Sequence, residues 1–306
     1  MPLIAAATRG SALARWQTDH VAALLAPTGA TVAAVVVDTR ADRRLDIPIW
    51  EMGGKGVFVK EVQAAVLDGR ARLAVHSGKD LPSIPHSDLV VAAVPRRADP
   101  RDVLVGATLA GLSTGAVVAT GSVRRRAQLS SRRPDLTFTG LRGNIATRLG
   151  KIPAGGAIVM AAAALDRLGL WDQLTTDGLQ FEVLAPEVLL PQVAQGALAI
   201  ECRRDDAELL ALLATIDDEA SHRVFDAERG FLAELGGDCD LPADAYGEFD
   251  ADGHIVLRAM LASLDGHVVL EHAVTADDPA TDPAMIGRDV ARWLLDDAGG
   301  SALLDR

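Results

Sequence analysis

Basic side chains crowd one short stretch of an otherwise acidic chain. Between positions 124 and 151 they are Arg124, Arg125, Arg126, Arg132, Arg133, Arg142, Arg148 and Lys151, and the only acidic residue among them is Asp135. The whole 306-residue chain carries a formal charge of -12, so this basic cluster contrasts with the acidic composition of the rest of the chain. Guanidinium groups bind carboxylates and phosphates through paired hydrogen bonds, and the amides at a helix N-terminus add further donors. This stretch predicts a site for a small molecule with many negative groups.

Three expected strand-to-helix turns place a hydroxyl, an amide or a glycine beside an arginine. They are Thr8-Arg9-Gly10-Ser11, Thr120-Gly121-Ser122 with Arg124 and Arg125, and Arg142-Gly143-Asn144 with Arg148. Ligands of open α/β sheets bind outside the carboxyl ends of the strands, where such turns lie. The alternative is that the arginines are solvated and pair with the many acids, and Arg126, Arg132 and Arg133 fit that alternative best.

Asp80 is the candidate for proton chemistry. It follows Lys79 on the segment 77–82, which leaves the expected buried strand 73–76. A carboxylate among cationic groups can exchange a proton with a bound amine. The alternative is a loop aspartate that caps a turn. His76 is interpreted as a hydrogen-bonded residue at the strand end rather than a ligand.

The two cysteines have different surroundings. Cys239 lies between glycines and Pro242, which predicts an exposed loop where a thiol can react. Cys202 follows an apolar run and is predicted to be a buried, inert thiol. Two thiols make neither a disulfide framework nor a four-ligand zinc site, and no metal is predicted. Gly53-Gly54-Lys55-Gly56 lacks the spacing of a phosphate loop and is interpreted as a flap with Lys55 as an anion contact.

The elements that must position these residues alternate between apolar strands and helices. Strands are expected at 32–37, 73–76, 89–94, 116–119, 136–139 and 157–161, and helices at 57–67, 123–129, 145–149 and 162–168. This alternation predicts parallel α/β sheets with helices on both faces. From about residue 218 the pattern changes to α+β, with strands at 246–249, 255–261 and 268–274 and a helix at 286–297.

Composition narrows the class of protein. Apolar residues make up 49% of the chain, which can supply real cores. The pI near 5 argues against general nucleic-acid binding. The sequence contains no run of about 20 apolar residues, so we expect no membrane helix. Its start lacks the basic region that is typical of a signal peptide. We therefore expect a cytoplasmic protein, and nothing in the sequence demands more than a monomer.

Taken in order, several motifs resemble the hydroxymethylbilane synthase (porphobilinogen deaminase) family. They are Thr8-Arg9-Gly10-Ser11 with Trp16-Gln17, the segments 53–61 and 74–82, Ser122-Val123-Arg124-Arg125, Leu141-Arg142-Gly143-Asn144 with Thr147-Arg148-Leu149, the segment 195–201 and Glu228-Arg229. One such motif would be weak evidence, whereas the ordered series is specific.

The resemblance implies an α/β fold of two lobes like those of periplasmic binding proteins, with parallel-rich sheets joined by two crossovers, and a small C-terminal α+β domain. The implied boundaries are 1–95 with 195–214 for the first lobe, 100–190 for the second and 218–306 for the third domain. The catalytic aspartate would lie in the first lobe, the arginine-rich anion site in the second and the reactive cysteine in the third.

The resemblance also implies the reaction. The family joins four porphobilinogen molecules head to tail, releases ammonia and frees linear hydroxymethylbilane. The primer is a dipyrromethane cofactor held by a thioether, here to Cys239. Asp80 would assist loss of ammonia, stabilise the cationic pyrroles and help remove the final ring proton. Carboxylates of the cofactor and growing chain would be held by Arg9, Arg124, Arg125, Arg142 and Arg148, with Ser11, Ser122, Lys79 and Asp42 as nearby polar contacts.

Some positions depart from the family pattern. They are Ala119 and Gly121 in the second-lobe turn, Gly78 before Lys79, Ala41 before Asp42, and Asp238, Asp240 and Asp244 around the cysteine. Two alternatives stay open: a divergent relative that acts on another pyrrole, and a non-catalytic two-lobed protein that binds a polycarboxylate. Retention of Asp80 and Cys239 favours the enzyme, because a pure binder needs neither.

Overall fold

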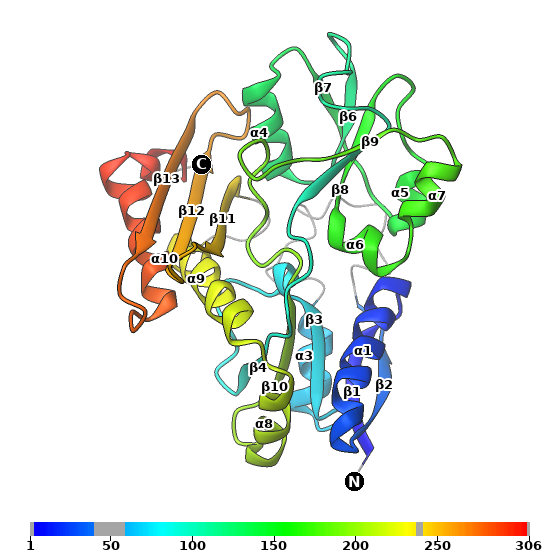
Figure 1. The fold of residues 1–306 in the computed structure, drawn as a ribbon, viewed down its shortest axis with the longest axis vertical. Helices are drawn as coiled ribbons and strands as arrows, with labels where there is room; N and C mark the ends of the chain where they lie inside the picture. The colour runs from blue at the N-terminus through cyan, green and yellow to red at the C-terminus, as the bar shows by residue number, and fades with distance from the viewer. Residues whose placement is uncertain (1–2, 40–58, 237–240, 305–306) are drawn as a thin grey trace. The chain divides into compact units, whose positions relative to one another are not determined.

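The computed structural model describes residues 3–39, 59–236 and 241–304. The chain divides into two compact units (Figure 1), the first Met1–Ala98 with Gly196–His222 and the second Asp99–Gln195 with Arg223–Arg306. Among the helices of the described ranges, none combines the length and apolar character that a membrane crossing requires.

The first unit is built on a five-stranded sheet of order β2-β1-β3-β10-β4. Its strands are β1 (Leu3–Arg9), β2 (Thr31–Val37), β3 (Leu73–Ser77), β4 (Leu89–Ala93) and β10 (Leu198–Arg203). Strand β1 pairs in parallel with β2 and β3, whereas β10 is antiparallel to both of its neighbours. The helices of this unit are α1 (Ala12–Leu25), α3 (Lys60–Leu67) and α8 (Ala207–Leu213), with 3-10 turns at Ala26–Thr28, Gly78–Asp80 and Ala214–Ile216.

Local sequence explains where α1 begins and ends. The hydroxyl of Ser11 accepts a hydrogen bond from the backbone N–H of Ala14 at 3.2 Å, which caps the first turn. Pro27 follows the last turn and Gly29 adopts a left-handed φ of 80°, so the chain turns toward β2. The apolar face of α1 packs Val21 and Leu25 into the core under the sheet.

The second unit repeats the same strand arrangement. Its sheet has the order β7-β6-β8-β5-β9, with β6 parallel to β7 and β8 and with β5 antiparallel to β8 and β9. The strands are β5 (Asp102–Val105), β6 (Val117–Ala119), β7 (Thr137–Thr139), β8 (Ala157–Ala161) and β9 (Phe181–Val183), and the helices are α4 (Val123–Arg132), α5 (Ile145–Leu149), α6 (Ala162–Arg167) and α7 (Trp171–Thr176). In each sheet one strand runs antiparallel to both of its neighbours: β10 in the first unit and β5 in the second. Each of these is the first strand after the chain enters from the other lobe.

The C-terminal part is α+β. Helix α9 (Glu219–Leu235) precedes an antiparallel sheet of β11 (Ala243–Phe249), β12 (Ile255–Ala262) and β13 (Val269–Ala276), and α10 (Pro283–Arg292) follows it, with a π-helical turn at Trp293–Asp297 and a 3-10 turn at Gly300–Leu303. Ala127 and Leu190 of the second lobe share a small core with Met260 and Ala262 of β12. The three-domain division and its boundaries therefore remain a prediction, because residues 223–306 group with the second lobe.

The predicted α/β fold class is confirmed: two α/β lobes, each with a parallel-rich sheet, are followed by a small α+β part. Two segments cross between the lobes, one between β4 and β5 and one between β9 and β10. On the second, Ala194 has a left-handed φ of 57°, which is uncommon for a residue other than glycine. Its N–H donates to the Glu228 carboxylate at 2.6 Å, which helps hold this conformation.

Candidate active site

A pocket of about 60 Å³ in the first unit collects polar side chains from two neighbouring strands. Its polar lining is Arg9, Ser11, Gln17, His76, Ser77 and Asp80, and its apolar lining comes from α1, β3 and the start of α3. Strand β1 ends at Arg9 and β3 ends at Ser77. Because the two strands are parallel neighbours, their carboxyl ends meet at one sheet edge, where ligands of such sheets bind.

Hydrogen bonds fix the shape of this pocket. The buried Gln17 side chain on α1 donates from Nε2 to Ser77 Oγ at 2.7 Å, which ties the helix to the end of β3. Directly after Ser77 the chain forms the 3-10 turn Gly78–Asp80. Asp80 and the adjacent Lys79 are half-buried on this turn. The structure thus brings Arg9, Ser11 and Asp80 to one pocket, although 71 positions separate the first of these from the last in sequence.

A buried polar group lies in the wall of the pocket. His76 Nε2 is 3.2 Å from Glu201 Oε2, and Gln63 Nε2 lies 3.0 Å from each oxygen of the same carboxylate. His76 is 5% exposed and Glu201 is 2% exposed. These contacts connect β3, β10 and α3, and His76 is the hydrogen-bonded strand-end residue that the sequence predicts.

The turn after β6 is the second place where the sequence predicts anion binding. Ser122 caps α4 and accepts from the N–H of Arg125 at 3.4 Å. The side chains of Arg124 and Arg125 enter the interior and are 3% and 6% exposed. Both donate to the fully buried Asp102, Arg124 to Oδ2 at 2.8 Å and Arg125 to Oδ1 at 2.6 Å. Sequence reasoning missed Asp102, since it lies 22 residues before Arg124 and no local pattern pairs them.

Backbone carbonyls take further donors of the two arginines. Nη1 of Arg124 donates to the carbonyl of Leu190 at 2.7 Å, and Nη1 of Arg125 donates to that of Val159 at 3.0 Å. Burial alone raises the pKa of Asp102, but the two guanidinium charges outweigh it and hold that pKa well below the usual range. Asp102 is therefore a fixed negative charge under the N-terminal turn of α4.

The third predicted turn joins β7 to α5. The Asn144 side chain caps α5 and accepts from the N–H of Thr147 at 3.0 Å. Arg148 Nε donates to the carbonyl of Gly143 at 2.8 Å, and both Arg142 and Arg148 are half-buried. Gly143 has a φ of 121°, and a Cβ there would lie 2.7 Å from Thr147, so this turn requires glycine.

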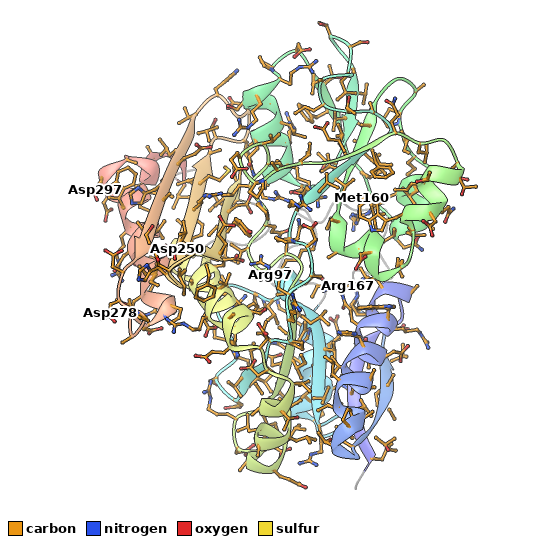
Figure 2. All side chains as sticks on the ribbon, in the orientation of Figure 1. Arg97, Met160, Arg167, Asp250, Asp278 and Asp297 are labelled. Carbon is orange, nitrogen blue, oxygen red and sulfur yellow. The ribbon has the colours of Figure 1, made fainter. Side chains whose placement is uncertain are left out.

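Arg167 is a further basic residue that sequence reasoning did not select. It lies at the end of α6 (Figure 2), which directly follows β8. Its exposed fraction is 9%. Burial lowers its pKa to about 10, an effect that the neighbouring Asp166 partly offsets. The sequence does hold a signal for Arg167: an arginine in an alanine-rich helix that directly follows a buried strand.

Some predicted site residues belong to parts of the chain that the structure does not describe. Asp42, Lys55 with its flanking glycines, and Cys239 lie outside the described residues. Cys202 is described, and it is buried as predicted. Burial is the main reason that its pKa is raised to about 11, which keeps this thiol protonated and inert.

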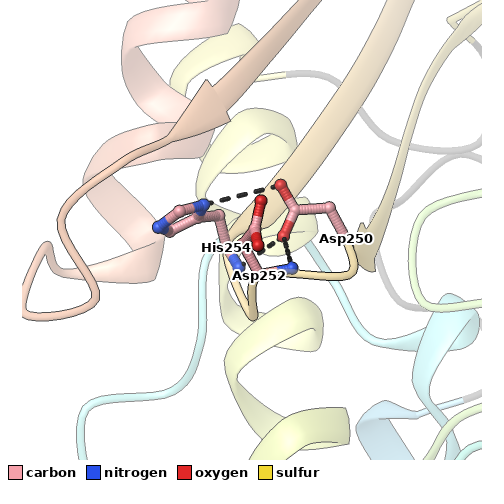
Figure 3. Close-up of side chains that lie close together, drawn as sticks. All are labelled: Asp250, Asp252 and His254. Carbon is pink, nitrogen blue, oxygen red and sulfur yellow. Dashed lines mark hydrogen bonds and ion pairs between the residues drawn. The ribbon is translucent and has the colours of Figure 1, made fainter.

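Within the described ranges, one group of side chains has the composition of a metal site. Asp250, Asp252 and His254 lie together at the turn between β11 and β12 (Figure 3). Asp250 Oδ1 accepts from the N–H groups of Asp252 at 3.0 Å and His254 at 2.9 Å. These bonds close the turn, so they account for the cluster without a metal ion.

The fold defines a two-lobed α/β protein with basic and acidic side chains at the carboxyl ends of its parallel strands. Two family models match the chain: "Porphobilinogen deaminase, dipyromethane cofactor binding domain" over residues 4–211 and "Porphobilinogen deaminase, C-terminal domain" over residues 223–296. The chain belongs to the porphobilinogen deaminase family.

Curated relatives agree over nearly the full length. The porphobilinogen deaminase of Roseiflexus sp. (strain RS-1) is 47% identical over 304 residues, which cover 97% of each chain. That of Nitratidesulfovibrio vulgaris (strain DSM 19637 / Miyazaki F) is 42% identical and covers 100% of this chain and 97% of its own. That of Bacillus subtilis (strain 168) is 40% identical, with 100% and 96% covered.

Proposed function

We propose that this protein is a hydroxymethylbilane synthase, a transferase that joins four porphobilinogen molecules head to tail with release of ammonia. The observation that carries the proposal is the pocket in which Asp80 lies with Arg9 and Ser11, in a chain that matches its family from end to end. We propose further that it acts in the cytoplasm as a monomer, in tetrapyrrole biosynthesis.

The residues present fit a dipyrromethane cofactor by their chemistry. Each pyrrole ring carries two carboxylates, so the group needs several cationic donors. Arg9 ends β1, Arg142 lies in the turn after β7, and Arg148 lies on α5; all three are half-buried. Arg125 adds a buried Nε that has no hydrogen-bond partner among the residues described. When bound, the cofactor supplies the ring to which the first substrate is joined. Cys239 would hold it through a thioether.

Asp80 would handle the proton balance of each condensation. The bond between the substrate's methylene carbon and its amino nitrogen breaks, a carbon–carbon bond forms, ammonia leaves, and the attacked ring carbon loses one proton. A carboxyl group on the pocket wall can give a proton to the leaving amine and later take one from the ring carbon. As a carboxylate it also stabilises positive charge that develops on a pyrrole beside it.

The exposure of each arginine would decide how it binds a ligand carboxylate. Arg9, Arg142 and Arg148 can meet ligand carboxylates from half-buried positions, with Ser11, Ser122, Lys79 and Asp42 as polar contacts. Arg124 and Arg125 already donate to Asp102, so a ligand carboxylate would reach them by exchange with that partner. It could also reach Nε of Arg125, which has no hydrogen-bond partner in the part of the chain that the structure describes.

The covalent cofactor is tested by the denatured intact mass of the purified protein. We expect an adduct equal to two linked porphobilinogen-derived pyrroles, and we expect Cys239→Ser to abolish it. Cys202→Ser is the matched control, because that thiol is buried and should leave the adduct in place. A bare polypeptide mass after incubation with porphobilinogen would favour a divergent or binding-only protein.

The role of Asp80 is tested by Asp80→Asn. General acid–base groups contribute roughly 100- to 10,000-fold, so ammonia release from porphobilinogen should fall by at least about 100-fold. The melting temperature and the mass adduct should match those of the wild type. Asp88→Asn, an exposed change in the same unit, should keep full activity. Undiminished turnover in Asp80→Asn would remove Asp80 from the mechanism.

A further inference from the structure

Four ionisable side chains form a buried ion cluster in the second unit: Asp102 of β5, Arg124 and Arg125 of α4, and Asp244 of β11. Each is 6% exposed or less. Three of them belong to the second lobe, and Asp244 comes from the C-terminal sheet. The charge of Arg124 is thus shared between carboxylates from two parts of the chain.

Asp244 is held in place through one of its two side-chain oxygens. Its Oδ2 lies 3.1 Å from Nε of Arg124, close enough for an ion pair though not aligned for a hydrogen bond. The same oxygen accepts from Nε2 of Gln128 at 3.1 Å. Gln128 is itself anchored, because it bonds both the N–H and the carbonyl of Leu190. Oδ1 of Asp244 is buried and makes no hydrogen bond within the described ranges.

The groups around Asp244 decide how easily it carries a charge. Arg124 and Arg125 favour the carboxylate, whereas Asp102 and the fully buried Glu228 of α9 oppose it. Burial is the largest influence, and it raises the pKa of Asp244 well above its ordinary value. Asp102, with a low pKa, keeps its charge. Asp244 is therefore the carboxyl of the cluster that keeps its proton to higher pH than Asp102 does.

We propose that Asp244 is a positioning residue of the anion site, and that a ligand carboxylate competes with it for the guanidinium of Arg124. The proposal rests on the proposed function. With Asp244 ionised, Arg124 has a carboxylate on Nε and another on Nη2 and offers little charge to a ligand. With a proton on Asp244, Asp102 is the one carboxylate of the cluster that still neutralises the charge of Arg124. A ligand carboxylate is then attracted to Arg124 more strongly. Binding of a ligand carboxylate at Arg124 is then accompanied by proton uptake at Asp244.

The central variant is Asp244→Asn, which has nearly the same shape and carries no charge. The KM for porphobilinogen should rise with pH in the wild type and stay flatter in the variant. At the alkaline end the KM of the variant should be lower by roughly 5-fold, the low end of coupling between neighbouring sites. A second readout does not need the loaded enzyme: apoprotein mixed with porphobilinogen should gain its mass adduct faster in the variant at high pH.

Asp277→Asn is the matched control, because it removes one exposed carboxylate from the same C-terminal part and should reproduce both wild-type profiles. Gln128→Leu is a second variant that leaves Asp244 in place. It removes a donor to the carboxylate and should move the rise in KM to higher pH. This variant decides the matter if Asp244→Asn does not fold.

The outcomes separate the two proposals. Identical KM–pH profiles and loading rates for the wild type and Asp244→Asn would overturn the role of Asp244 while leaving the enzyme assignment intact. A wild type that neither gains an adduct nor releases ammonia would overturn the proposed function, and the inference with it. A lower melting temperature in Asp244→Asn with unchanged KM and loading would mean a purely structural carboxylate, which also refutes the proposal.

Discussion

Removal of the Asp102 charge should destabilise the second unit strongly. Asp102 has no exposed surface and accepts from Arg124, Arg125 and the Gln195 amide at 2.8, 2.6 and 2.9 Å. Asp102→Asn keeps the size of the side chain but points an amide donor at groups that are themselves donors. Within the buried ion cluster, Asp244 would then be the remaining carboxyl beside two buried guanidinium groups, and burial raises its pKa.

The magnitude follows from the burial. Breaking a buried ion pair by removing one partner costs about 3–5 kcal/mol, because the remaining charge stays uncompensated. For bodies of 150–250 residues each kcal/mol lowers the melting temperature by about 2–4 °C, so a drop of roughly 6–20 °C is expected. Asp99→Asn is the control, since Asp99 pairs with Arg101 at the surface with 34% of its side chain exposed. Exposed pairs contribute about 0–1 kcal/mol.

Thermal unfolding followed by circular dichroism and calorimetry measures this effect, at neutral pH and in acid. The folded-state pKa of Asp102 is depressed, so its stabilisation is fully present above the unfolded value of about 3.9 and is lost as pH falls through the folded value. The gap between wild type and Asp102→Asn should therefore persist down to about pH 4 and narrow only below it. A drop of roughly 6 °C or more is expected at pH 7. A variant that melts within about 2 °C of the wild type would show that Asp102 does not stabilise this unit through its charge.

Three further predictions concern other buried groups. The pKa of Asp244 is raised in the folded state, so its contribution to stability falls as pH rises from about 4 through its folded-state pKa. Asp244→Asn should remove that fall, which melting temperatures measured over a series of pH values would show. Glu201→Gln should cost about 1–3 kcal/mol in urea unfolding, because the buried Gln63 amide loses one of its two acceptor oxygens, and no loss would mean that the group is not structural. Ala194→Gly relieves a left-handed residue and should change stability by about 0 to +1 kcal/mol, whereas Ala197→Gly should lose about 0.5–1 kcal/mol; equal losses would refute the strain argument.

Local sequence was sufficient for most of the secondary structure. The apolar runs at 73–76 and 157–161 became central strands, because a strand buried on both faces must be apolar along its length. The run at 32–37 also became a strand, although it lies at the sheet edge and most of its residues are only partly buried or exposed. The helix predicted at 286–297 begins earlier, at Pro283, because Asp282 caps it and proline suits the first helical turn. The strands of the C-terminal sheet were found from alternation, since each has one face toward the core.

The candidate site was only partly predictable. Arg9 and Asp80 were selected separately, from the residue types at two strand ends, and the sheet order then placed them in one pocket. Exposure of the arginines was not predictable in the same way. Arg124 and Arg125 look alike in sequence to Arg126, yet the first two are buried and the third is exposed. Helical geometry points neighbouring side chains in different directions, and only the packing around α4 decides which direction is the interior.

The sequence by itself determined the class of this protein, because apolar periodicity and an ordered series of motifs are properties of the chain read from end to end. It identified the residue types that can do the proposed chemistry. Only the tertiary structure decided which charges meet: Asp102 and Asp244 reach Arg124 from 22 and 120 positions away, from different sheets. The physical reason is that burial and ion pairing depend on distance in space and on the exclusion of water, and neither is encoded in the local spacing of residues.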